Sequence, residues 1–188
     1  MRLRCLVTLL LALAASGAHA QPGPSPTAWF SGPSGRSSVP LQRAIDQKLY
    51  LTVTVKGQPL NLFIDTGATT VLHADVARRL GLPLTDTEDE AIGITGVAGT
   101  RQLAVVDLVL GKTTITNYQV SALDLTATRE LHAANGMPVF DGLIGADLLA
   151  VLRARVDFDK LVLEVRRPDQ ATLDRIGLTR AAERPTPD

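Results

Sequence analysis

The sequence predicts a mainly β fold, a small closed β-barrel with one or two short helices. Three observations lead to this prediction. Between residues 49 and 166, apolar and polar residues alternate over many short stretches, which is the period of a strand with one buried face. Turn-forming pairs, such as those at 56–57 and 111–112, separate these stretches. Only two short segments, 73–80 and 147–153, have helical spacing in this region.

The first 20 residues have the composition of a secretory signal peptide. Arg2 and Arg4 precede an apolar run over residues 5–15, and residues 18–20 read Ala-His-Ala, a small-x-small cleavage site. The apolar run is too short for a membrane-spanning helix. We therefore expect export with cleavage after Ala20, and no stable insertion into the membrane afterwards.

The expected mature chain has no cysteine and a nearly balanced charge. Cys5 is the one cysteine of the sequence and lies in the leader, so neither disulfides nor thiol chemistry is expected. Arg2 and Arg4 also leave with the leader, so 17 of the 19 basic residues remain against 19 acidic ones. This balance does not suit a nucleic-acid surface, and we expect no nucleic-acid partner. We also expect no cofactor and no metal ion.

The chain after the leader divides into three parts. Residues 21–44 are rich in proline, glycine and serine, so we expect a linker or arm that does not fold alone. Trp29 and Phe30 form an aromatic pair within it. An arm lying on the surface is the preferred interpretation, and a pro-segment that docks into a cleft is the alternative. Residues 45–167 are expected to form the domain, and residues 168–188 a tail.

The domain is organised around residues 60–72, which read LNLFIDTGATTVL. Residues 49–55 and 60–64 form the two strands of a predicted hairpin, and Asp65 follows the second strand. A carboxylate at the end of a buried strand is costly unless it is used or paired. Gly67 allows a sharp turn, and Thr66 offers a hydroxyl that can tie the turn to neighbouring backbone. The pattern indicates a catalytic aspartate loop.

The elements after this loop are assigned from spacing. Residues 73–80 are predicted to form a helix that ends at Gly81. His73 has no second histidine near it in the sequence, so it is interpreted as a surface or capping residue rather than a ligand or base. Residues 124–137 are polar and irregular, and we expect a loop or a single helical turn there. Further strands are expected over residues 103–110 and 139–144, two short strand-like pieces over residues 113–123, and a closing hairpin over residues 156–165.

Two segments together resemble a known family. Residues 63–72 (FIDTGATTVL) are similar to the active-site segment of the retropepsin-like aspartic proteases, a single-lobed family that includes the retroviral proteases and a bacterial periplasmic branch. Residues 141–149 (DGLIGADLL) are similar to the later hydrophobic-hydrophobic-glycine signature of that family, in matching order and spacing. The resemblance implies a barrel of the retropepsin-like (acid protease) type and, together with the leader, a periplasmic or secreted location.

The resemblance also implies the site residues. The expected catalytic residues are Asp65, Thr66 and Gly67, and the expected substrate-binding residues are Ala68, Ile94, Gly96, Val97, Gly99 and Ile144. Residues 91–100 alternate glycine with small apolar residues and occupy the position of the family's flap. Such a hairpin opens and closes over an extended peptide, because glycine relaxes its backbone.

The number of aspartate loops determines the expected assembly. Aspartic proteolysis needs two carboxylates that share a proton across a water molecule. The sequence has one Asp-Thr-Gly and no Asp-Ser-Gly, and the domain is about half the size of a two-lobed protease. We therefore expect a homodimer in which each protomer contributes Asp65 across a twofold axis, acting on a protein or peptide substrate.

Two alternatives to an enzyme stay open at this point. One is a catalytically silent dimer of the cell envelope that binds extended peptides or acts as a scaffold. The other is a structural envelope protein in which Asp65 is only a capped turn residue. The sequence does not identify a substrate, because the walls of substrate pockets come from loops.

Overall fold

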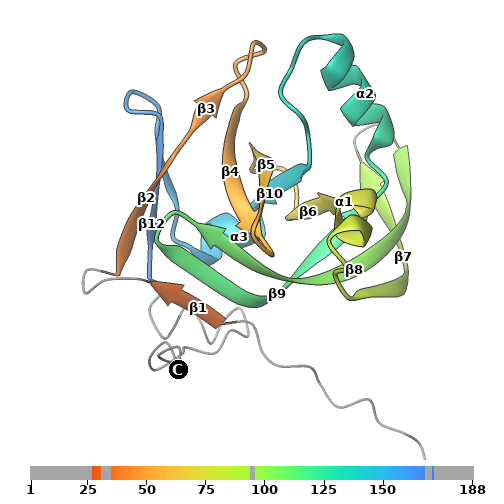
Figure 1. Ribbon diagram of the computed structural model, residues 1–188, viewed down its shortest axis with the longest axis horizontal. Coiled ribbons are helices and arrows are strands. Elements are labelled where there is room, and N and C mark those ends of the chain that lie inside the picture. Colours follow the sequence, from red (N-terminus) through yellow and green to blue (C-terminus); the bar gives the residue numbers. More distant parts are fainter. Residues whose placement is uncertain (1–26, 31–34, 94–95, 168–170, 172–188) are drawn as a thin grey trace, which may run out of the picture.

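The computed structural model describes residues 27–30, 35–93, 96–167 and 171 of the chain. Within these residues the chain forms twelve strands and three helices (Figure 1). The mainly β class predicted from the alternating pattern is confirmed. The structure contains one helix more than the one or two expected.

The strands range in length from two to fifteen residues. The strands are β1 (Thr27–Phe30), β2 (Arg36–Pro40), β3 (Gln42–Arg43), β4 (Leu49–Val55), β5 (Gln58–Asp65), β6 (Val71–His73), β7 (Leu84–Gly93), β8 (Gly96–Leu110), β9 (Thr113–Leu123), β10 (Gly142–Gly145), β11 (Arg155–Asp157) and β12 (Val162–Arg166). The helices are α1 (Ala74–Arg79), α2 (Thr126–Ala134) and α3 (Ala146–Val151).

Six strands close into a barrel. Their order is β4, β5, β10, β6, β9 and β8, and β8 pairs back to β4. The pairs β5–β10 and β6–β9 are parallel, and the other pairs of the barrel are antiparallel. β10 therefore lies between β5 and β6, although it follows them far along the sequence. Outside the barrel, β7 pairs with β8, β1 with β9 and β3 with β4, while β11, β12 and β2 form a separate three-stranded sheet.

The barrel interior is an apolar cluster built from alternate strand residues. β4 contributes Leu51, Val53 and Val55, and β5 contributes Leu60 and Leu62. Each of these side chains is at most 2% exposed. Burial of apolar surface is the main driving force for folding, and the period-two pattern decides which face of each strand points inward.

A second apolar cluster lies on the other face of β4 and β5. Tyr50 and Phe63 are register partners, and their rings stack with centroids 5.1 Å apart. Phe140 lies 5.4 Å from Phe63, and the His132 ring meets both phenylalanine rings at steep angles, 5.0 and 4.9 Å away. We call Tyr50, Phe63, His132 and Phe140 the aromatic cluster. Through the contacts of His132 with the two phenylalanine rings, this cluster packs α2 against the barrel.

The segment 124–137 contains a nine-residue helix, α2, where a loop or a single turn was expected. The sequence did not predict this helix because it is polar, and His132 is its one buried residue. Asp124 stabilises the start of the helix by accepting hydrogen bonds from the backbone N–H and the hydroxyl of Thr126. The helix is therefore held at its start and by one docked ring, without the continuous apolar face that sequence patterns detect.

Some residues assigned to the arm belong to the folded domain. β2 pairs with β12 through all five of its residues. Val39 and Leu41 are 2% and 5% exposed and join the barrel core. Ser37, Val39 and Leu41 alternate inward, a period-two pattern that the proline- and serine-rich composition obscured. The domain therefore extends back at least to residue 35, before the boundary placed at residue 45.

β1, which contains Trp29 and Phe30, pairs with residues 113–116 at the start of β9. The aspartate loop meets the same strand at Ser121, whose N–H donates to the Thr70 carbonyl at 3.2 Å. The intervening strand spans about 17 Å at about 3.3 Å per residue. The backbone of β1 therefore lies away from the aspartate loop, on the edge of the sheet.

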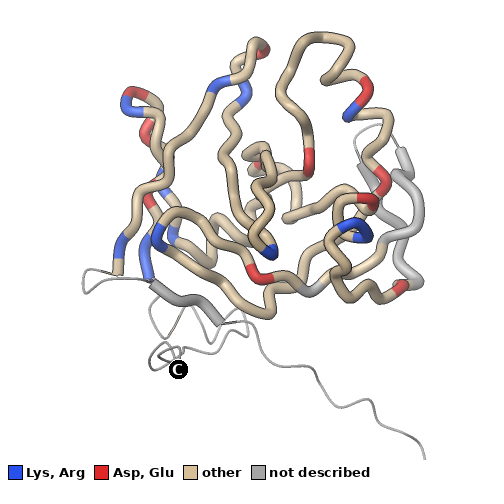
Figure 2. The backbone as a smooth tube through the Cα atoms, in the orientation of Figure 1, with Lys and Arg blue, Asp and Glu red and all other residues tan. Residues whose placement is uncertain are grey.

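Charged residues of both signs are spread over the described elements (Figure 2). One of them, Lys56, donates from its ammonium group to the carbonyls of Leu80 and Gly81 and so satisfies backbone groups after α1. Among the described residues, none of the helices has both the length and the apolar character needed to cross a membrane.

Candidate active site

Asp65 ends β5, and its side chain is exposed. The register places it opposite Gly145, the last residue of β10, which runs parallel to β5. Because strand residues alternate, Asp65 shares a face with Phe63, while the residues on either side of Phe63 face the core. Asp65 Oδ1 accepts a hydrogen bond from the Gly67 N–H at 2.8 Å. The turn therefore holds an exposed carboxylate in a defined orientation.

The structure brings the other loop residues into the same turn. The Ala68 N–H donates to the Asp65 carbonyl at 3.3 Å. Thr66 and Gly67 are exposed like Asp65, and Ala68 is half-buried. The loop is therefore open to a ligand or to a second protein copy.

Gly145 lets β10 approach the loop more closely than a residue with a side chain could. A Cβ atom at this position would collide with the backbone of Ala68 and Thr69. The close approach allows the Ala146 N–H to donate to the Ala68 carbonyl at 2.8 Å. The glycine of the second motif is therefore required by its packing against the aspartate loop.

Asp147 holds the far end of the loop. Its Oδ1 accepts hydrogen bonds from the backbone N–H and the hydroxyl of Thr70, both at 2.8 Å, and its Oδ2 accepts one from the Tyr118 hydroxyl at 3.0 Å. The Thr70 hydroxyl in turn accepts a bond from the Gly145 N–H at 3.1 Å. We call Thr70, Tyr118 and Asp147 the Asp147 clamp.

The clamp is largely shielded from water. Thr70 is 1% and Tyr118 7% exposed. Burial and, after it, the adjacent Asp147 carboxylate raise the pKa of Tyr118 far above its ordinary value. The hydroxyl therefore remains protonated and keeps donating to Asp147.

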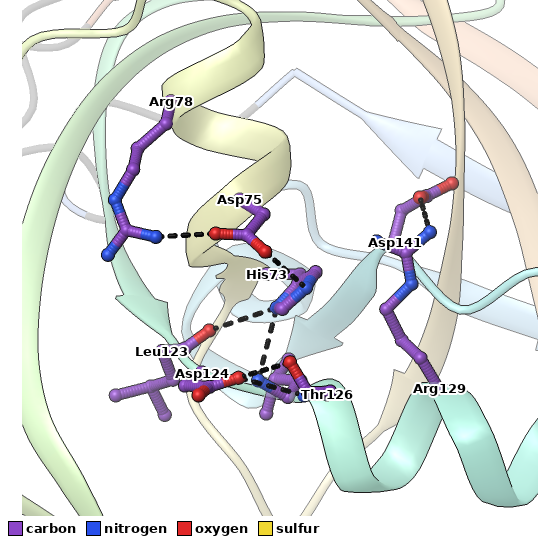
Figure 3. A network of polar contacts seen from close by, with 9 residues as sticks. His73, Asp75, Arg78, Leu123, Asp124, Thr126, Arg129 and Asp141 are labelled. Carbon is purple, nitrogen blue, oxygen red and sulfur yellow. Dashed lines mark hydrogen bonds and ion pairs between the residues drawn. The ribbon is translucent and has the colours of Figure 1, made fainter.

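Asp141, just before β10, makes polar contacts with several neighbouring elements (Figure 3). Its Oδ2 accepts a hydrogen bond from the Asn61 N–H at 3.0 Å, and the Arg129 guanidinium of α2 lies 3.8 Å from Oδ1. Its carbonyl accepts a bond from the His73 N–H at 2.9 Å. Asp141 therefore joins β5, β6 and α2. Because Asp141 and Asp147 are both engaged in the scaffold, Asp65 is the carboxylate of these segments that faces outward.

His73 was expected to be a surface or a capping residue. It occupies the N-cap position of α1, but it is buried rather than on the surface. Its side chain makes no capping hydrogen bond to the helix. Instead, Nδ1 accepts a bond from the Leu125 N–H at 3.1 Å, which ties α1 to the segment before α2. Figure 3 shows His73 between Asp75 and Leu123. Within the described ranges, no group of three His, Cys, Asp or Glu residues could hold a metal ion.

The described residues of the segment expected as a flap, 91–100, belong to the paired strands β7 and β8. β7 and β8 pair up to Gly93 and Gly96, and Ile92 pairs with Val97. Gly96, Val97 and Gly99 belong to β8. Ile94 lies outside the described residues.

Ile144, expected to bind substrate, is fully buried in the barrel core opposite Ile64. The alternation of β10 explains the difference, because it turns Leu143 and Gly145 toward the face that carries Asp65. Leu143 packs against the cluster that contains Phe63. Leu143 is therefore the residue of this motif whose side chain lies on the site face.

Sequence reasoning also missed the scaffold around Asp65. Asp141 and Asp147 lie inside the second motif, so their positions were visible but their hydrogen bonds were not. Tyr118 comes from β9 and had no local signal, because its role depends on the parallel pairing of β6 with β9.

Three comparisons with known proteins were informative to different degrees. The family model described as aspartyl protease matches residues 51–148, a little more than half of the chain, and includes the first motif and all but the last residue of the second. No protein of the curated set matches.

Several solved structures are similar to this chain. One is a retropepsin-like aspartic protease from Rickettsia conorii, with 21% identity, 76% of this chain and 94% of that chain covered, and a TM-score of 0.46. Another is EIAV protease complexed with the inhibitor HBY-793, with 21% identity, coverage of 61% and 96%, and a TM-score of 0.46. A third is the retroviral protease-like domain of Ddi1 from Leishmania major, with 18% identity, coverage of 63% and 87%, and a TM-score of 0.44.

Proposed function

The chain belongs to the aspartyl protease family, and on this premise we propose that it is an exported endopeptidase that works as a homodimer. A water molecule is activated between the Asp65 carboxylates of the two protomers. The observation that carries the proposal is the exposed Asp65 on a loop braced from behind by Gly145 and the Asp147 clamp. A rigid, outward-facing carboxylate suits a group that must meet its twin and a substrate.

The chemistry follows from two carboxylates at one centre. Close like charges push their ionisations apart, so one Asp65 is ionised while the other keeps a proton. The ionised carboxylate accepts a proton from water as the water oxygen bonds to the peptide carbonyl carbon, and the protonated one donates a hydrogen bond to the carbonyl oxygen. The tetrahedral intermediate then breaks its C–N bond: the leaving nitrogen takes the proton that the first carboxylate accepted from water, and the second carboxylate keeps its own proton as the new carboxyl group forms.

The hydrogen bond from Gly67 contributes to this chemistry. The Gly67 N–H donates to Asp65 Oδ1 at 2.8 Å, so the carboxylate orientation is set before substrate binds. Thr66 follows Asp65 in the exposed turn, where it can contact the second protomer.

The proposed substrate is an extended peptide or protein segment. Ala68 and the flap residues Ile94, Gly96, Val97 and Gly99 contact it in this proposal. The hairpin of β7 and β8 supports the assignment, because its strands meet at two glycines, where the backbone bends with little steric restriction. Opening and closing of this hairpin would admit the peptide and then exclude water.

Export rests on the first 20 residues. Arg2 and Arg4, the apolar run and the Ala-His-Ala site support cleavage after Ala20 and a periplasmic or secreted mature form. Mass spectrometry of the exported protein should find Gln21 at the amino terminus, and a mature form that retains Cys5 would contradict this part of the proposal.

A diverse peptide library tests the activity. The mature form should cleave a subset of peptides, and the Asp65→Asn and Asp65→Ala variants should cleave none while keeping the circular dichroism spectrum of the wild type. Peptides that bind the wild type but stay intact would identify a silent peptide-binding dimer instead. If the wild type neither binds nor cleaves any peptide, Asp65 is only a structural turn residue.

A further inference from the structure

A pocket of about 460 Å³ lies between β2 and the turn that joins β8 to β9. β2 contributes Arg36, Ser37 and Ser38, and the turn contributes Gly111 and Lys112. Figure 2 shows several Lys and Arg positions gathered at this side of the molecule. We call this the β2 pocket.

The lining of the β2 pocket is basic. It includes Arg36 and Lys112, and none of the described residues that line it is acidic. Both side chains are exposed, and neither has a hydrogen-bond or ion-pair partner within the described ranges. Two unpaired cations that line one pocket repel each other, so an anion bound between them would stabilise the arrangement.

The strand register adds to the positive charge beside the pocket. Arg36 lies directly opposite Arg166 in the antiparallel β2–β12 ladder, and like charges at such positions are destabilising. The Glu164 carboxylate lies 3.6 Å from the Arg166 guanidinium and offsets its charge. Arg36 has no such partner among the described residues, so its charge remains available to a ligand.

The pocket also contains a hydroxyl that is shielded from bulk water. Ser37 is 8% exposed, and its Oγ accepts a hydrogen bond from the Lys112 N–H at 3.1 Å. The hydroxyl proton has no acceptor among the described residues, so it can donate to a ligand. Gly111 allows the turn to come this close, because a Cβ atom there would lie 3.2 Å from Ser37 Oγ. The donors are therefore held together before a ligand binds.

These donors suit a phosphate group. The guanidinium of Arg36 is a planar fork that can bind two oxygens of an oxyanion, and the ammonium of Lys112 adds a compact charge. A phosphate group has several strong acceptor oxygens, so it can meet the guanidinium, the ammonium and the Ser37 hydroxyl together. The volume also falls in the range of sites for small molecules, about 300–1,000 Å³.

The β2 pocket is separate from the candidate active site. Lys112 comes directly before β9, whereas the aspartate loop meets β9 at Ser121. These two positions lie about 30 Å apart along the strand, at about 3.3 Å per residue. The lining of the pocket includes no residue of the aspartate loop or of the Asp147 clamp.

We propose that the β2 pocket binds a phosphate group through Arg36, Lys112 and the Ser37 hydroxyl. The phosphate belongs either to a soluble phosphate ester or to a lipid headgroup, since both present the same oxyanion. The inference goes beyond the proposed protease function and does not depend on Asp65.

Titration with inorganic phosphate at constant ionic strength tests the site. The amide NMR signals of Ser37 and Lys112 should shift and saturate with a Kd on the order of 1 mM. Arg36→Gln and Lys112→Gln should each weaken binding about tenfold, because each removes a charge-assisted hydrogen bond. Arg79→Gln is the matched control, because Arg79 is exposed on α1 and does not line the pocket, and its Kd should equal that of the wild type.

Vesicles distinguish the two sources of phosphate. If the source is a lipid headgroup, the protein should sediment with vesicles of equal parts phosphatidylcholine and phosphatidic acid, and not with phosphatidylcholine alone. Arg36→Gln should weaken this association about tenfold, and Arg79→Gln should leave it unchanged. Binding of inorganic phosphate without sedimentation on vesicles identifies a soluble phosphate ester. Both results support the site.

Three results would overturn the inference. One is the absence of a saturating shift at Ser37 and Lys112 in the wild type. Another is an equal loss of binding in Arg79→Gln, which would show that net charge alone attracts phosphate. The third is binding of acetate as tight as that of phosphate, which would replace the phosphate with a carboxylate.

Discussion

Asp147→Ala is the perturbation that tests the bracing of the aspartate loop. It removes the acceptor of three hydrogen bonds, two from Thr70 at 2.8 Å and one from Tyr118 at 3.0 Å. The two residues that supply these three donors, Thr70 and Tyr118, are shielded from water, at 1% and 7% exposure. Each unpaired buried donor costs about 1–3 kcal/mol. We expect a total loss of about 3–5 kcal/mol, the range for deleting one partner of a buried charged interaction.

Urea unfolding measures this loss. With a slope of about 2 kcal/mol per molar urea, the midpoint should fall by roughly 2 M at an unchanged slope. Tyr118→Phe removes one of the three bonds and should cost about 1 kcal/mol. Asp147→Asn keeps an acceptor oxygen for Thr70 and should recover most of the stability.

Asp159→Ala provides the control, because Asp159 is an exposed acid in the turn between β11 and β12. Its free energy of unfolding should stay within about 0.5 kcal/mol of that of the wild type. Hydrogen exchange at the Thr70 amide should accelerate in Asp147→Ala and not in Asp159→Ala. The reasoning would be refuted by an Asp147→Ala variant as stable as the control.

Two further predictions concern the loop and α2. Gly145→Ala should lose at least about 2 kcal/mol in urea unfolding because its Cβ meets the loop backbone. Gly67→Ala, with a nearest contact of 3.3 Å to Asp65 Oδ1, should lose less; equal losses would contradict the packing argument. Hydrogen bonds from the Thr126 hydroxyl, the larger cause, and from the Thr126 N–H hold the pKa of Asp124 below the ordinary 3.8. The ionised carboxylate therefore stabilises the fold above about pH 3.8. That contribution is lost as the pH falls through the lowered pKa. Thr126→Val should raise the pKa of Asp124 in an NMR titration, and an unchanged pKa would count against the hydroxyl as the main cause.

The parts of the fold with a local period could be predicted from the sequence. The hairpin that delivers Asp65, helix α1 and the glycine of the second motif follow from spacing and turn chemistry. β2 could not be predicted, because its alternation lies within a proline- and serine-rich segment. α2 could not be predicted either, since one docked ring, His132, replaces an apolar face.

The site could be predicted only as far as its motifs. Asp65 and its turn are local, whereas the Asp147 clamp depends on β9 lying beside β6. Ile144 was assigned to the substrate because of its place in a motif, and the pleat of β10 turns it into the core instead. Residue type therefore indicates the chemistry, while tertiary pairing decides which neighbours serve it.

The central claim is that one catalytic centre uses Asp65 from two protomers. Wild type is mixed with a ninefold excess of Asp65→Asn under conditions that allow subunits to exchange, and peptide cleavage is measured per wild-type subunit. Wild type then pairs with wild type about one time in ten by mass action, so the activity per wild-type subunit should fall to about one tenth. Phe158→Asp changes an exposed residue and keeps Asp65, so in the same excess the cleavage per Asp65-bearing subunit should not fall. Activity per wild-type subunit that stays constant in the Asp65→Asn mixture would contradict the shared centre.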